Sequence, residues 1–197
     1  MNSLNVAQRS DAWYQARLGK FTASSFASLM AGLDTGAFTD LVKDKAWERL
    51  TGTPVESYTN AAMQHGIDTE AQARDWYRFE TGNEVSEIGF VLHPEFEVAG
   101  CSPDGLVQEL GLVEIKCPQP RAHIDVLASK KLPSKYRWQV QGQLWITGRK
   151  WCDFVSYHPA QGGICIKVEA DADDQDRLIE RIQLADKKVI ELLEKAS

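Results

Sequence analysis

The spacing of apolar and polar positions divides the chain into a helical first part, a middle rich in strands and a helical end. Apolar residues recur every three or four positions in segments 39–50 and 60–82, which predicts two helices. Two shorter helices are expected before them, because Ser10 and Asp11 can cap a first helix through Arg17, and residues 22–25 can cap a second that runs to about residue 31.

Short segments rich in Val, Ile and Phe follow, and turns containing Pro, Asp and Gly separate them, which is typical of strands. The expected strands are 84–92, 97–102, 105–108, 111–117, 151–157 and 164–170. Helices are expected at 121–131, at 134–148 with Ser134 as its cap, and at about 173–194. This order predicts a mixed α/β fold, with a central mixed β-sheet flanked by helices in one domain spanning residues 1–197.

The expected hairpin CSPDGLVQELGLVEIKCP, residues 101–118, carries charged residues inside apolar runs. Glu114 and Lys116 are two positions apart on one strand and therefore share a face, while Val113 and Ile115 point to the other face. Asp104 lies next to the neighbouring strand, so its carboxylate can meet that of Glu114. The apolar flanks indicate a buried position, where bare charges are costly.

This arrangement suits a divalent metal and a phosphodiester. Asp104, Glu114 and the backbone carbonyl of Ile115 are hard oxygen ligands of the kind that Mg²⁺ prefers, and Lys116 can hold the attacking water or stabilise charge on the phosphate. The pattern is short enough to arise by chance. The alternative is an exposed hairpin in which Glu114 and Lys116 form a surface ion pair worth less than ~1 kcal/mol.

The charge of the chain is unevenly distributed. The net charge is −6, but segment 121–151 holds seven basic residues and one acidic residue, so it is net +6 and the remainder is net −12. A basic stripe on an acidic body can guide a polyanion to one surface, and it can equally be a solvated helix face.

Two further features limit the class of protein. The four cysteines form no CxxC pair, which favours reduced, buried thiols over a disulfide framework, a zinc site or an iron–sulfur cluster. No apolar run approaches the ~18 residues of a membrane span, and the N-terminus lacks a secretion signal. We therefore expect a soluble, intracellular protein without a membrane partner.

Four segments, in the right order, resemble the phage lambda exonuclease family, also called YqaJ-like viral recombinases, within the PD-(D/E)xK nuclease superfamily. CSPDGL…LVEIKCP is similar to the metal site of the family, and SDAWYQARLGKFTAS to its N-terminal signature. HGIDTEAQAR resembles its helix with an additional catalytic Glu, and YRWQVQGQLWITG its Gln-bearing helix. The resemblance covers most of residues 10–158 and implies a restriction-endonuclease-like PD-(D/E)xK core.

The resemblance implies roles for eight positions. They are Asp104 and Glu114 as metal ligands, Lys116 as the catalytic lysine, Glu70 as a carboxylate that positions the water or a second metal, Gln139 as a support of the site, Arg17 and Ser24 as a 5′-phosphate pocket, and Met63 as an apolar wedge that splits the terminal base pair.

Several of these residues have simpler interpretations. Glu70 can be an ordinary helix acid, Gln139 a surface amide, Arg17 a partner of Asp11, and Met63 core filler. After Lys116, two nearby prolines leave open whether Arg121 or His123 faces DNA.

The function implied by the resemblance is a Mg²⁺-dependent exonuclease, with Mn²⁺ as a substitute. It would degrade one strand of double-stranded DNA from the 5′ end, releasing mononucleotides and leaving 3′ overhangs for annealing recombination. The family further implies a toroidal homotrimer, a phage single-strand annealing protein as partner, and the cytoplasm of a bacterial host as location. Two alternatives stay open: a structure-selective or restriction-type endonuclease with the same metal site, and a catalytically inactive module that binds DNA ends.

Overall fold

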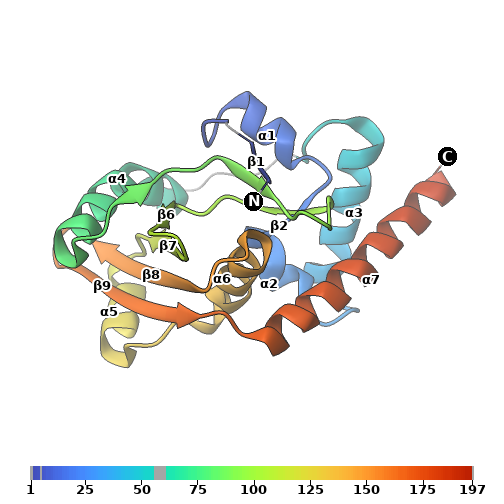
Figure 1. The fold of residues 1–197 in the computed structure, drawn as a ribbon. Coiled ribbons are helices and arrows are strands. Elements are labelled where there is room, and N and C mark those ends of the chain that lie inside the picture. The colour runs from blue at the N-terminus through green and yellow to red at the C-terminus, as the bar shows by residue number, and fades with distance from the viewer. Residues whose placement is uncertain (1, 5, 56–60, 197) are drawn as a thin grey trace.

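A mixed five-stranded β-sheet forms the centre of the molecule (Figure 1). The structure is a computed structural model, and it describes residues 2–4, 6–55 and 61–196. The strand order is β3-β6-β7-β8-β9, with β7 and β8 parallel and the other neighbours antiparallel. The strands are β3 (Val85–Ser86), β6 (Gly105–Val107), β7 (Gly111–Lys116), β8 (Trp151–His158) and β9 (Gly162–Glu169). This arrangement confirms the predicted central mixed sheet.

A second sheet of four short strands lies beside the N-terminal part of the chain. Its order is β1 (Asn2–Leu4), β4 (Phe90–Leu92), β5 (Ala99–Cys101) and β2 (Phe21–Thr22). The prediction of one strand over 84–92 is wrong, because β3 and β4 belong to different sheets. The chain changes sheets near Gly89, where a Cβ atom would lie 2.2 Å from the carbonyl oxygen of Val6. A side chain at this position would prevent that close approach of the two backbones.

Most of the predicted helices are present within a few residues of their expected ends. They are α1 (Asp11–Arg17), α2 (Phe26–Leu29), α3 (Gly36–Thr51), α4 (Ala61–Thr81), α5 (Pro120–Ser129), α6 (Ser134–Thr147) and α7 (Ala172–Ala196), with a 3₁₀ turn η1 (Ala23–Ser25) before α2.

Helix starts agree with the sequence in two cases and differ in one. Ser10 caps α1 by accepting a hydrogen bond from the N–H of Trp13. Within the predicted cap region 22–25, Thr22 pairs with Gly100 of β5 and a 3₁₀ turn follows. Ser25 occupies the N-cap position of α2, which ends two residues earlier than predicted. Ser134 is the first residue of α6 and Pro133 occupies the capping position, so the predicted serine cap is wrong. Proline suits that position because its ring already fixes φ near the value needed there.

Helices pack on both faces of β7. On one face, Val113 and Ile115 join Tyr77 of α4 in a buried cluster. On the other face, Leu112 joins Val140 of α6 in a second cluster that also includes part of α5. A third cluster joins α2, α3 and the long helix α7, which Figure 1 shows running beside α3. The strand that carries Glu114 and Lys116 is therefore covered on both sides.

Candidate active site

Asp104 and Glu114 meet at the open end of the β6–β7 hairpin. Gly105 pairs with Val113, so the residue before β6 lies opposite Glu114. The N–H of Ile115 donates to Oδ2 of Asp104 at 2.6 Å. Since the N–H and C=O of one residue face the same neighbour in an antiparallel pair, the carbonyl of Ile115 faces the same edge as Asp104. The structure thus brings the three predicted metal ligands to one place.

Glu114 is held by three donors although its side chain is almost fully buried. Its residue is 1% exposed. Gln139 Nε2 donates to Oε1 at 2.5 Å and Gln143 Nε2 to Oε2 at 2.6 Å. Lys116 Nζ lies 2.6 Å from Oε1. These partners compensate for the loss of water around the carboxylate and fix its orientation.

The pKa values of Asp104 and Lys116 are both shifted by burial and by neighbouring charges. Burial, and then the nearby Glu114, raise the pKa of Asp104 well above its usual value. Burial alone would lower the pKa of Lys116, but Glu114 and Asp104 outweigh that effect and raise it. Two carboxylates therefore face one ammonium group, and an additional cation would relieve the excess negative charge.

The donor set fits a metal that needs few protein ligands. In the described parts of the chain, no group of three His, Cys, Asp or Glu side chains is arranged to hold a metal ion. Asp104 and Glu114 supply two carboxylates, and each keeps lone pairs beyond those used by its hydrogen bonds. Mg²⁺ commonly binds through one or two carboxylates together with waters and phosphate oxygens, so these residues suit it.

Glu70 approaches the site from α4, but arginines hold its carboxylate. Arg9 Nη2 lies 2.5 Å from Oε2 and Arg74 Nη2 lies 2.8 Å from Oε1. Glu70 is near enough to contribute to the raised pKa of Asp104. In this arrangement the charge of Glu70 is already balanced, and its predicted role in placing water or a second metal stays a prediction.

Arg17 and Ser24 lie together in a cavity next to Glu114. Arg17 Nη2 lies 3.4 Å from Oγ of Ser24, and its guanidinium stacks on the ring of Trp13 at 4.0 Å. The cavity has a volume of about 190 Å³. Its lining residues are Gln8, Trp13, Arg17, Ala23, Ser24, Ser102, Gln139 and Gln143. Because two glutamines contact both the cavity and Glu114, the predicted phosphate pocket adjoins the predicted metal site.

Arg17 remains a cation at neutral pH despite its burial. Burial lowers the pKa of Arg17 to about 10, which is still well above neutrality. A charged guanidinium beside a hydroxyl group is a suitable donor set for a phosphate. Arg17 does not form the pair with Asp11 that the sequence left open. Its polar partners in the described residues are Thr22 and Ser24.

Two site residues were not identified from the sequence. Gln143 holds Glu114, and its spacing of four from Gln139 on a helix is the signal that would have found it. Trp13 lines the cavity and donates from Nε1 to Oγ of Ser102 at 2.8 Å. The side chain of Met63 lies outside the described part of the structure, and its role as a wedge stays a prediction.

Two basic residues of segment 121–151 form contacts within the protein. Arg137 forms a bidentate pair with Asp174, and Arg149 donates to backbone carbonyls, including that of Gly111. His123 is buried and contacts Ser156 and Gln161, whereas Arg121 is exposed. Of these two residues, Arg121 is therefore the one available to a ligand outside the protein.

All four cysteines are free thiols. Cys101 and Cys152 are buried, and Cys117 and Cys165 are half-buried free thiols. Among the helices that the structure describes, none has the length and apolar character to cross a bilayer.

Comparisons with known proteins place these features in a family. Residues 12–150 match the profile of the YqaJ-like viral recombinase domain. The structure is similar to an alkaline exonuclease (LHK-Exo) from Laribacter hongkongensis, with 36% identity, coverage of 95% of this chain and 96% of that one, and a TM-score of 0.89. The same relative in complex with dAMP gives a TM-score of 0.90.

Two more distant relatives extend the comparison. A phage-related exonuclease from Haemophilus somnus 129PT has a similar fold, with 18% identity, coverage of 90% of this chain and 96% of that one, and a TM-score of 0.74. The uncharacterized protein R354 of Acanthamoeba polyphaga mimivirus is 26% identical over 161 residues, which are 75% of this chain and only 28% of that protein. The fold is thus the expected restriction-endonuclease-like PD-(D/E)xK class. Since the profile matches more than half of its length, the chain belongs to the YqaJ-like viral recombinase family.

Proposed function

We propose that this chain is a Mg²⁺-dependent exonuclease that degrades one strand of double-stranded DNA from its 5′ end. The products would be mononucleotides and a 3′ single-stranded overhang. The observation that carries the proposal is the direct connection between two sites: Gln139 and Gln143 hold Glu114 and also line the cavity of Arg17. A strand end bound in the cavity would present its first internal phosphodiester to the carboxylates.

The residues of the cavity and those of the metal site would have distinct roles. Arg17 and Ser24 would bind the terminal 5′-phosphate through a charged donor and a hydroxyl group. Asp104 and Glu114 would hold the metal, which supplies Lewis-acid activation of the phosphodiester when bound. Lys116, close to Glu114 and charged, would orient the attacking water or stabilise charge that develops on the phosphate. Gln139 and Gln143 would keep the carboxylate of Glu114 in position.

The relatives support the same chemistry. The Laribacter protein is an alkaline exonuclease at 36% identity, and one of its structures contains dAMP. A deoxynucleoside monophosphate is the kind of product expected when DNA is degraded one nucleotide at a time. Because the residues that would bind a 5′-phosphate and a metal are all present here, we extend exonuclease activity to this chain.

Assembly and partners form a further part of the proposal. With a net charge of −6, the chain has little general attraction for DNA. A toroidal homotrimer, as the family resemblance implies, would retain DNA by enclosing it. The same resemblance supports a phage single-strand annealing protein as partner, in the cytoplasm of a bacterial host.

Digestion of linear duplexes tests the proposal. One set of duplexes would carry 5′-phosphate ends and a matched set 5′-hydroxyl ends, each with Mg²⁺, with Mn²⁺ or with a chelator. We expect loss of one strand from each end, faster from the phosphate end, and no reaction with the chelator. Closed circular DNA is the control. Its cleavage would contradict the exonuclease and favour an endonuclease with the same metal site.

A further inference from the structure

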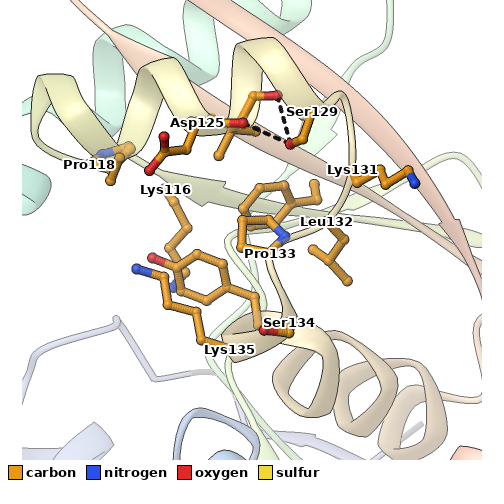
Figure 2. A pocket seen from close by; sticks show the side chains of 14 residues that line it. Lys116, Pro118, Asp125, Ser129, Lys131, Leu132, Pro133, Ser134 and Lys135 are labelled. Carbon is orange, nitrogen blue, oxygen red and sulfur yellow. Dashed lines mark hydrogen bonds between the residues drawn. The ribbon is translucent and has the colours of Figure 1, made fainter.

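A second pocket adjoins Lys116, and its composition differs from that of the cavity of Arg17. Its volume is about 420 Å³. Figure 2 shows Lys116 of β7 and Lys135 of α6 reaching into the same space, with Leu132 and Pro133 from the connection between α5 and α6 beside them. The other lining residues include Val126, Tyr136 and Phe154.

Two lysines lie close to one aromatic ring. Lys116 Nζ is 5.3 Å and Lys135 Nζ is 4.8 Å from the ring centroid of Tyr136. Tyr136 also packs against Phe154, with ring centroids 5.3 Å apart. A flat, supported ring with cations close to it is the combination that binds unpaired bases and their phosphates in single-stranded nucleic acids.

The charge of the pocket favours an anion. Its lining contains Lys116, Lys131 and Lys135 against a single carboxylate, Asp125. The walls are otherwise apolar or hydroxyl-bearing, so a phosphate alone would leave most of the pocket unfilled. A nucleotide matches both parts, because its base is flat and apolar on its faces and its phosphate is anionic.

Helix α6 gives the direction of a bound strand. Tyr136, Gln139 and Gln143 are spaced by three and four residues, so they follow one face of the helix over about 10 Å. Gln143 lines the cavity of Arg17, Gln139 contacts Glu114, and Tyr136 lines the second pocket. A strand whose 5′-phosphate is in the cavity therefore reaches Tyr136 only after it has passed the metal-binding carboxylates.

We infer that this pocket is a subsite for the nucleotide on the 3′ side of the scissile phosphate. Its base would stack on Tyr136, and the phosphate on its 3′ side would lie near Lys135. The inference rests on the proposed exonuclease function. It adds Tyr136 as a residue that determines the register of the bound strand. It also implies that the second nucleotide is unpaired before the first is released.

A cycle that combines a protein variant with a modified substrate tests the subsite. The substrates are 5′-phosphorylated duplexes that are either complete, abasic at the second nucleotide or abasic at the tenth. The rate of release of the first nucleotide would be measured for the wild-type protein and for Tyr136→Leu, which keeps an apolar side chain but removes the ring. We expect the second-position lesion to slow the wild-type protein about tenfold, as loss of one stacked base should.

The Tyr136→Leu substitution and the lesion at position two should not slow the reaction more together than either does alone. Tyr136→Leu should be slowed about tenfold on the complete duplex and no further by the lesion at position two. Tyr136→Phe should behave like the wild-type protein, and the lesion at position ten should have no effect on either. The subsite would be contradicted if the lesion at position two slowed Tyr136→Leu further, or if it did not slow the wild-type protein. Neither result would contradict the proposed exonuclease function. If the wild-type protein released no nucleotide, the proposed function would fail and the subsite with it.

Lys135→Ala gives a test that does not depend on the aromatic packing. Lys135 is exposed, so its removal should not disturb the fold. We expect a higher KM and a weaker dependence of KM on salt, because one phosphate contact is lost. Lys150→Ala, at another exposed lysine of the basic segment, is the matched control and should change neither value. An equal effect of the two variants would show that the pocket makes no specific phosphate contact.

Discussion

Gln143 donates to Oε2 of Glu114 at 2.6 Å, and it is the one side-chain donor that the described residues provide to that oxygen. The other oxygen, Oε1, accepts from Gln139 and lies beside Lys116. The two oxygens of one buried carboxylate are therefore unequally supported. This difference separates the roles of two glutamines that lie one helical turn apart.

The unequal support predicts different effects for two similar substitutions. Gln143→Leu leaves Oε2 without its donor and should lower the free energy of unfolding by about 1–3 kcal/mol, whereas Gln139→Leu should lower it less because Lys116 remains at Oε1. Urea denaturation in the presence of a chelator measures both. With Mg²⁺, each variant should lose about 10- to 100-fold in activity because Glu114 is less firmly oriented. Equal destabilisation by the two variants would contradict this assignment of donors.

Arg17 is predicted to distinguish between the two kinds of DNA end. Arg17→Ala removes the charged donor and should lower kcat/KM on 5′-phosphate duplexes about 10- to 100-fold, the range expected for hydrogen bonds to a charged group. On 5′-hydroxyl duplexes the change should be small, so the preference for phosphate should largely disappear. Steady-state kinetics on the paired substrates measure this preference. A similar loss on both would indicate that Arg17 acts through packing on Trp13.

Tyr77 provides a test that separates stability from catalysis. Its buried hydroxyl donates to Oδ2 of Asp153 at 2.7 Å, on the side of the sheet that α4 covers. Tyr77→Phe leaves a buried carboxylate without one donor and should lower the free energy of unfolding by about 1–3 kcal/mol. Activity well below the unfolding temperature should be unchanged, because Glu114 lies on the opposite face of β7. Lost activity without lost stability would place Tyr77 in the site instead.

The sequence predicted those parts of the site that depend on local periodicity. Glu114 and Lys116 share a face because side chains alternate along any strand, and the packing of Val113 and Ile115 on the other face agrees. The turn between β6 and β7 is short, so the position of Asp104 opposite Glu114 also followed from local order.

Other features depend on contacts between distant segments and had no local signal. The split of segment 84–92 results from the approach of Gly89 to Val6, which lies more than eighty residues earlier. The pairing of Glu70 with Arg9 joins positions 61 apart. The second pocket arises where β7 meets the connection between α5 and α6, and no periodicity in either segment indicates it.

Asp104 provides the last prediction, which links the charge of the site to metal binding. Asp104→Asn removes one of two adjacent carboxylates, and its side-chain oxygen can still accept the N–H of Ile115. In metal-free buffer we therefore expect no loss of Tm, since the repulsion with Glu114 is relieved. Mg²⁺ or Mn²⁺ should raise the Tm of the wild-type protein because both bind the folded state, and this rise should be absent in the variant, as should activity. Glu109→Gln, at an exposed acid in the turn of the same hairpin, is the matched control and should keep both the rise and the activity. If Asp104→Asn retained the metal-dependent rise in Tm, the cation would bind elsewhere.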